Sequence, residues 1–97
     1  MFHYLYILQS QKDKKFYTGI TGDLRKRFKE HNSGKNISTS YRRPFKLIYY
    51  EAYLLKEDVE AREKYLKTSM GKRVLKKQLK NFINLSNSAK INLESKE

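Results

Sequence analysis

Two charged side chains occupy positions where the surrounding pattern would place apolar ones. Leu24 and Phe28 form the apolar stripe of a predicted helix, and Arg27 falls on the same face. In a later helical segment, Glu63 follows Val59 at i+4 and therefore lies in its core-facing row. A charge in such a row costs free energy unless it meets an opposite charge or borders a cleft. An arginine there suits an anion and a carboxylate suits a hard cation, so the pattern predicts a polar site.

Two tyrosines bring hydroxyl groups to this site from a predicted β-hairpin. The apolar and aromatic runs 4–8 and 16–20 are separated by a lysine-rich polar connection, which is typical of two antiparallel strands. The alternation of side chains puts Tyr6 on one face of the first strand, and Tyr17 shares a face with Gly19 in the second. A glycine inside a strand indicates that another group approaches it closely.

The rest of the chain supplies the elements that position these side chains. Residues 46–54 form the strongest strand, rich in β-branched and aromatic residues. Helical periods predict helices near 23–33, 57–69 and 72–82. We therefore expect an α+β fold in which a three-stranded antiparallel sheet is flanked by helices, in the order β-β-α-β-α-α.

The composition predicts one small domain. The chain has 97 residues, too few for two self-sufficient cores, so we expect a domain over 1–83 and a polar tail over 84–97 that frays. It has no cysteine, which removes disulfides and thiolate metal sites. Its apolar runs are too short to cross a membrane. We therefore expect a cytoplasmic protein without a membrane partner.

The charge balance predicts a polyanionic partner. Lys and Arg total 22 against 10 Asp and Glu, a formal net charge of +12. Nucleic acid is the expected partner, with DNA first and RNA as an alternative. A simpler interpretation of the same excess of Lys and Arg is a basic surface that serves solubility. The candidates for phosphate contacts are Lys35, Arg42, Arg43, Lys72 and Arg73.

The two strands of the hairpin carry a resemblance to a known family. Their tripeptides, Tyr4-Leu5-Tyr6 and Tyr17-Thr18-Gly19, resemble the two half-motifs that name the GIY-YIG nuclease superfamily. Tyr6, Tyr17 and Gly19 match the motif. Tyr4 stands in place of its first glycine, and Thr18 in place of its second isoleucine.

The resemblance continues over roughly residues 3 to 80. It includes Leu24-x-x-Arg27-x-x-x-His31-Asn32-x-Gly34, Arg42-Arg43-Pro44 and Ala61-Arg62-Glu63-Lys64. Within the superfamily, the chain is most similar to small stand-alone members and to the N-terminal nuclease domain of the bacterial excision repair endonuclease. After the second half-motif, where some members carry a lysine, this chain has Ile20 and Thr21.

The resemblance implies a metal-dependent endonuclease that hydrolyses phosphodiester bonds in DNA, with selectivity for branched or damaged structures, in repair or recombination. It implies Mg²⁺ or Mn²⁺ held by Glu63 and a scissile phosphate bound by Arg27. It assigns Tyr6 and Tyr17 to positioning or deprotonating the attacking water, and it places His31 among the catalytic residues. Which tyrosine takes the proton stays open at this point.

Other interpretations of the same residues remain. The tyrosines can serve as core aromatics, Glu63 can form a structural ion pair with Arg27, and His31 can cap its helix. The protein would then be a nucleic-acid-binding module that does not cleave, or a structural protein of a ribonucleoprotein. The sequence favours the enzyme, because binding alone gives no reason for Glu63 to face inward, where it repels phosphate.

Overall fold

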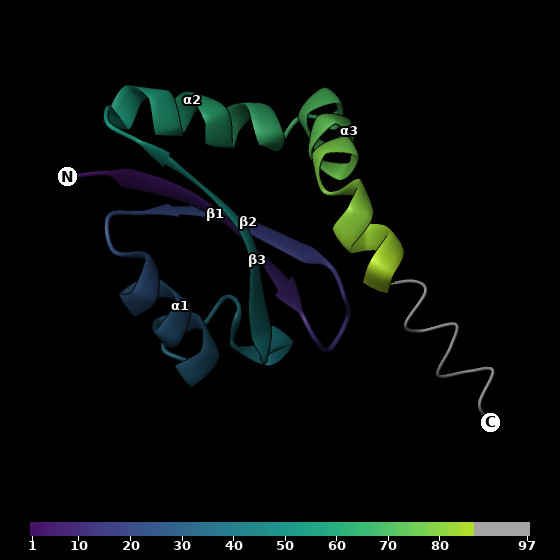
Figure 1. The fold of residues 1–97 in the computed structure, drawn as a ribbon. Coiled ribbons are helices and arrows are strands. Elements are labelled where there is room, and N and C mark those ends of the chain that lie inside the picture. Colours follow the sequence, from purple (N-terminus) through teal and green to yellow (C-terminus); the bar gives the residue numbers. More distant parts are fainter. Residues whose placement is uncertain (87–97) are drawn as a thin grey trace. The chain divides into compact units, whose positions relative to one another are not determined.

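The computed structural model describes residues 1–86, which form two compact units, one over residues 1–65 and one that begins at Leu66. Each unit is described by itself. The first contains β1 (His3–Ser10), β2 (Phe16–Thr21), α1 (Leu24–Ser33), the short 3₁₀ helix η1 (Ser40–Arg42), β3 (Phe45–Tyr53) and α2 (Lys56–Leu66) (Figure 1). The second contains α3 (Ser69–Gln78) and a further helical stretch over 80–86.

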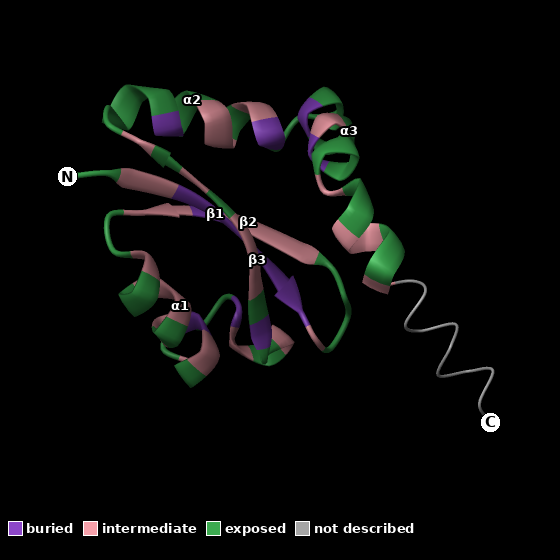
Figure 2. Ribbon diagram, in the orientation of Figure 1, coloured by how far each residue is buried: buried purple, intermediate pink, exposed green. Residues whose placement is uncertain are grey.

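The three strands form the predicted antiparallel sheet, in the order β2-β1-β3. At the middle of β1, Tyr6 is paired with Gly19 of β2 and with Tyr50 of β3. Both faces of this central strand are covered, and Figure 2 shows its middle and end as buried. Leu5 and Ile7 are fully buried, and Tyr6 is 1% exposed. The middle of β1 is therefore a continuous apolar run in the sequence, as expected for a strand with neither face exposed to water.

The face of the sheet that carries Tyr6 packs against α1. Tyr6 and Leu8 form a cluster with Phe45, and the apolar stripe of α1, Leu24 and Phe28, packs onto it. This is the stripe that the sequence pattern predicted. Burial of these aromatic and aliphatic side chains is the main force that holds α1 on the sheet.

The opposite face packs against α2. Glu51 of β3 is paired with Leu5 and lies on this face, and its carboxylate accepts hydrogen bonds from Arg62 of α2, with Nε and Nη2 each at 3.0 Å. The hydroxyls of Tyr49 and Tyr53 donate to the same carboxylate. Glu51 is thus a satisfied, structural carboxylate that ties α2 to the sheet.

Polar contacts fix both ends of α1. Asp23 caps the helix by accepting from the Lys26 N–H at 3.1 Å, and Gly34, with φ +84°, ends it in the left-handed conformation. The side-chain amide of Asn32 accepts from the Phe45 N–H at 2.6 Å and donates to the Phe45 carbonyl at 3.0 Å. These two bonds pin the end of α1 to the start of β3, so the rotation of α1 is determined.

The predicted boundary between the last two helices is wrong. α2 ends at Leu66 instead of residue 69, and α3 begins at Ser69 instead of residue 72. The cause is Thr68, whose hydroxyl accepts from the Gly71 N–H at 3.0 Å and so caps a new helix.

The order of elements also contains one more helix than expected, because residues 80–86 are helical. This helix passes the expected start of the tail at residue 84. The remainder of the predicted tail, 87–97, lies outside the described residues. Within residues 1–86, none of the helices combines the length and the apolar character that a bilayer crossing requires.

Candidate active site

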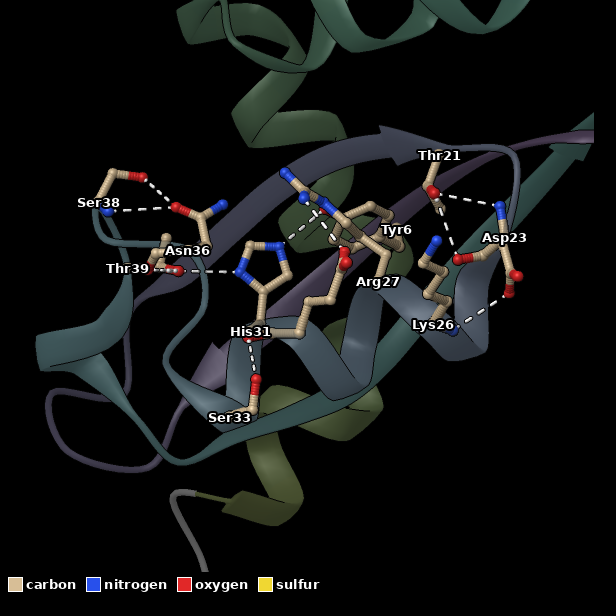
Figure 3. Close-up of polar contacts among 11 residues, drawn as sticks. Tyr6, Thr21, Asp23, Lys26, Arg27, His31, Ser33, Asn36, Ser38 and Thr39 are labelled. Carbon is tan, nitrogen blue, oxygen red and sulfur yellow. Dashed lines mark hydrogen bonds and ion pairs between the residues drawn. The ribbon is translucent and has the colours of Figure 1, made fainter.

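The hydroxyl of Tyr6 lies at the centre of a polar cluster beneath α1 (Figure 3). Its oxygen is 3.0 Å from Nε2 of His31, and the Arg27 guanidinium interacts with it. The Tyr17 ring centroid lies 6.3 Å from that of Tyr6 and 5.0 Å from that of His31. Glu63, on α2, is close enough to raise the Tyr6 pKa. The structure thus brings Tyr6, Tyr17, Arg27 and His31 together, and Glu63 acts on this cluster through its charge.

His31 is fully buried, and both of its ring nitrogens are hydrogen-bonded. Nε2 contacts Tyr6, and Nδ1 is 2.9 Å from Oγ1 of Thr39. Thr39 is itself 2% exposed and donates to the Asn36 carbonyl at 3.5 Å. The ring nitrogens of His31 therefore bind side chains rather than the carbonyls at the end of α1, so a capping role does not describe this histidine.

This arrangement favours one tautomer of His31. The Thr39 hydroxyl lies 3.5 Å from the Asn36 carbonyl, and if it donates there, its oxygen accepts from Nδ1–H of the imidazole. Nε2 then carries the lone pair, and the Tyr6 hydroxyl donates to it. Thr39 could not be predicted as part of the site, because nothing in the sequence distinguishes one threonine in a polar loop. Only the fold brings it to the histidine.

Burial holds both partners of this hydrogen bond in their neutral forms. Burial lowers the pKa of His31, and the nearby Arg27 charge lowers it further. Burial also raises the pKa of Tyr6, while the Arg27 guanidinium acts in the opposite direction. At neutral pH the site therefore contains a phenol that donates to an uncharged imidazole.

The lowered pKa of His31 predicts that the fold is acid-sensitive. The unfolded chain, with a histidine pKa of about 6.5, binds the proton more readily than the folded chain, so stability is lost as pH falls below that value. We expect the urea midpoint of the wild type to fall between about pH 7.5 and pH 5.5, and part of this fall to disappear in His31→Gln.

His3 is the other histidine of the chain, so His3→Gln is the matched control. It should retain the wild-type pH dependence. An equal pH dependence in wild type and His31→Gln would show that His31 does not titrate on unfolding.

Gly19 makes room for the Tyr6 phenol. A Cβ atom built on Gly19 would lie 2.6 Å from Cζ of Tyr6 and still closer to its hydroxyl oxygen. These distances are too short for real contacts, and the ring cannot move freely because His31 holds it. The glycine that the sequence flagged for close approach is therefore next to the central hydroxyl of the site.

We expect Gly19→Ala to destabilise the protein and displace Tyr6. The ordinary gain of alanine over glycine in a strand is outweighed by overpacking, which typically costs about 1–3 kcal/mol. Gly22→Ala is the control, because a Cβ there meets nothing within 4 Å. Denaturant unfolding of both variants measures the difference. A Gly19→Ala midpoint equal to that of Gly22→Ala would contradict the packing argument.

Arg27 lies at the edge of the site, with 37% of its side chain exposed. Its Nη1 pairs with Oε1 of Glu30, one turn along α1, at 3.4 Å. The carboxylate that contacts Arg27 is thus Glu30, on the same helix. A long, partly exposed pair contributes little stability, so Arg27 can exchange Glu30 for a phosphate at small cost.

Glu63 is the residue that the resemblance assigns to a metal ion. Glu63 is half-buried, and its negative charge contributes to the raised pKa of Tyr6. Within residues 1–86, no three His, Asp or Glu side chains gather as a ligand set. A cation here would have one protein carboxylate, which suits Mg²⁺ or Mn²⁺ that keep several water and phosphate ligands.

The residues predicted to contact phosphate differ in their surroundings. Lys35 is exposed and lines a shallow depression of about 390 Å³ that Arg27 also lines. Arg42 pairs with Asp13 at 3.2 Å and has 14% of its side chain exposed, so it also ties the hairpin loop to the segment before β3. Arg43, and Lys72 and Arg73 of the second unit, are exposed.

These elements define a GIY-YIG-type α+β domain. Its hairpin carries two tyrosines, its first helix an arginine and a histidine, and the helix after the third antiparallel strand a glutamate. The chain belongs to the GIY-YIG family, whose catalytic domain matches residues 2–79. The family is one of nucleases that generally depend on a divalent metal, so nuclease is the functional class and nucleic acid the class of substrate.

The similar proteins are UPF0213 proteins. One from Clostridium perfringens is 44% identical over 66 residues, covering 67% of this chain and 70% of that protein. One from Streptococcus pyogenes serotype M5 is 45% identical over 65 residues, covering 66% of this chain and 70% of that protein. The solution NMR structure of the UPF0213 protein BH0048 from Bacillus halodurans has a TM-score of 0.49 and 38% identity, covering 77% of this chain and 82% of that chain.

Proposed function

We propose that this protein is a metal-dependent endonuclease that hydrolyses phosphodiester bonds in DNA, selects for DNA structure and acts in repair or recombination. The observation that supports this most strongly is that the charges of Arg27 and Glu63 both act on the Tyr6 hydroxyl, which is hydrogen-bonded to His31. A module that only binds nucleic acid gains nothing from a carboxylate at this position. The absence of cysteine agrees with a cytoplasmic location.

In this proposal, Arg27 and Glu63 manage the negative charge of the reaction. Arg27 binds the scissile phosphate and stabilises the charge that develops on its oxygens. Glu63 would hold Mg²⁺ or Mn²⁺, and the bound cation would supply further positive charge to the phosphate. Glu30, which contacts Arg27 in the free protein, is released as the phosphate takes its place.

Tyr6 and His31 together handle the proton of the attacking water. Water gives a proton to the Tyr6 oxygen, while the Tyr6 hydroxyl proton passes to Nε2 of His31, 3.0 Å away. The imidazole can accept it because it is neutral at pH 7, so Nε2 carries a lone pair. Tyr17 is half-buried, and its hydroxyl has no hydrogen-bond partner among the described residues, so it is left to orient the water.

This division of roles predicts unequal effects of removing the two hydroxyls. We expect Tyr6→Phe to reduce the single-turnover cleavage rate by about 10²–10⁴-fold, the range for general acid–base catalysis. Tyr17→Phe should reduce it by roughly tenfold, the effect of one hydrogen bond. Both changes keep the aromatic ring, and thermal unfolding of each variant checks that the fold survives. Equal losses would contradict the assignment of the base.

Cleavage of defined DNA structures tests the proposed function. Purified protein is incubated with branched, nicked, single-stranded and duplex DNA, with Mg²⁺, with Mn²⁺ and with a chelator. We expect cleavage with either metal and none with the chelator. If no structure is cleaved with either metal, while DNA still binds in a salt-dependent way, the protein is the non-catalytic binding module instead.

A further inference from the structure

The depression beside Arg27 is formed by two parts of the first unit. Arg27 and Glu30 border it from α1, and the segment after α1 supplies Lys35, Asn36, Ile37 and Ser38. Its volume of about 390 Å³ lies within the range of about 300–1,000 Å³ that ligand pockets occupy. Because Arg27 lines this depression, the depression adjoins the residue that binds the scissile phosphate in the proposed function.

The polar groups of this depression are mainly donors. The Asn36 Oδ1 accepts from the Ser38 N–H at 3.2 Å and from its hydroxyl at 2.7 Å. Because a backbone N–H can only donate, these bonds fix which end of the amide is oxygen. Figure 3 shows the Nδ2 atom on the other side, away from Ser38. Nδ2 has no partner among the described residues, so with Lys35 it offers donors to an acceptor-rich ligand.

Ile37 adds an apolar face to this polar depression. Its side chain is 86% exposed, although it is large and aliphatic. A single exposed aliphatic residue is ordinary on a protein surface. This one, however, lines the same depression as Arg27 and Lys35. An apolar face surrounded by donors is complementary to a nucleotide, which has an apolar base face, acceptor atoms and a phosphate.

The segment that carries Ile37 is tied to the catalytic cluster. Thr39 is buried, and its hydroxyl is bonded to Nδ1 of His31 at 2.9 Å. The Thr39 N–H also donates to the Asn36 carbonyl at 3.2 Å. The position of residues 36–38 relative to the cluster is therefore determined by buried hydrogen bonds, and a ligand held there has a defined place beside Arg27.

We propose that this depression binds one unpaired nucleotide next to the scissile phosphate, which deepens the proposed function and rests on it. Ile37 packs on the base face, the Asn36 amide donates to the nucleotide, and Lys35 contacts the flanking phosphate. The nucleotide must be unpaired, because stacking in a duplex covers the base faces that Ile37 needs. The site thus selects single-stranded or locally opened substrates.

Binding without cleavage tests this selectivity. The wild-type protein, in chelator, is titrated into a fluorescein-labelled single strand and into the hairpin duplex of the same sequence, with fluorescence anisotropy as the readout. We expect tighter binding of the single strand. Ile37→Ser should weaken single-strand binding by roughly tenfold, the scale of one lost base contact, and leave duplex binding unchanged. Ile37→Tyr should retain the preference, because an aromatic ring also stacks on a base.

Two further variants provide a control for the loss of an aliphatic side chain and a test of the Asn36 donor. Leu54→Ser removes another exposed aliphatic side chain, 66% exposed, and should change neither affinity. Asn36→Asp keeps the acceptor for Ser38 and replaces the donor by a charged oxygen, so it should weaken single-strand binding. Equal wild-type affinities for the two DNAs, or an Ile37→Ser effect no larger than that of Leu54→Ser, would overturn the proposal.

These results separate the nucleotide site from the catalytic proposal. Metal-dependent cleavage without any effect of Ile37→Ser on binding would overturn the nucleotide site and leave the nuclease. A single-strand preference that Ile37→Ser removes, in a protein that never cleaves, would support the nucleotide site and overturn the nuclease.

Discussion

Glu63→Gln is expected to reduce metal-dependent cleavage by about 10³-fold or more, while DNA affinity stays equal or becomes tighter. The substitution keeps the size and polarity of the side chain, so the fold should be retained. It removes the carboxylate that is proposed to hold the metal ion. It also removes a negative charge that repels phosphate, which is the reason that binding should not weaken.

The neighbouring Glu60, exposed on the same helix, gives the matched control. Glu60→Gln changes the net charge by the same amount and should leave the cleavage rate unchanged. Cleavage rates over a Mg²⁺ titration, with DNA affinity measured in chelator, separate metal binding from DNA binding. If Glu63→Gln cleaves as fast as the wild type, the metal assignment is wrong.

Arg27→Ala is expected to have the second large effect, a loss of about 10²–10³-fold in the cleavage rate, the scale of one electrostatic stabiliser of a transition state. The guanidinium interacts with the Tyr6 hydroxyl, and in the proposed function it also binds the scissile phosphate, so its removal should affect the developing charge on both. Arg27→Lys should recover little of this loss, because an ammonium lacks the planar fork that binds phosphate oxygens.

Arg25, exposed on the same helix, supplies the control for net charge. Arg25→Ala removes the same charge away from the Tyr6 hydroxyl and should affect cleavage only through weaker binding. Single-turnover rates at saturating protein exclude that contribution. A loss in Arg25→Ala as large as in Arg27→Ala would show that general basicity, rather than a positioned arginine, explains the effect.

Local signals in the sequence determined the elements and supplied the candidate residues of the site. The apolar runs of the hairpin and the stripe of Leu24 and Phe28 depend on neighbours within a few positions, so their strands and helix could be predicted. Arg27 and Glu63 were noticeable because each breaks such a local row. The boundary between α2 and α3 was predicted wrongly because it depends on a hydroxyl cap at Thr68 inside an otherwise continuous pattern.

The tertiary structure alone decided how these residues work together. The sequence indicated that another group approaches Gly19, but the register of β1 against β2 showed that it is the Tyr6 phenol. The fold also places Thr39, eight positions further along the chain, on Nδ1 of His31, a contact on which the proposed roles of the two tyrosines depend. Such contacts join residues that are far apart along the chain, and their geometry depends on how strands and helices pack, which no local pattern of side chains encodes.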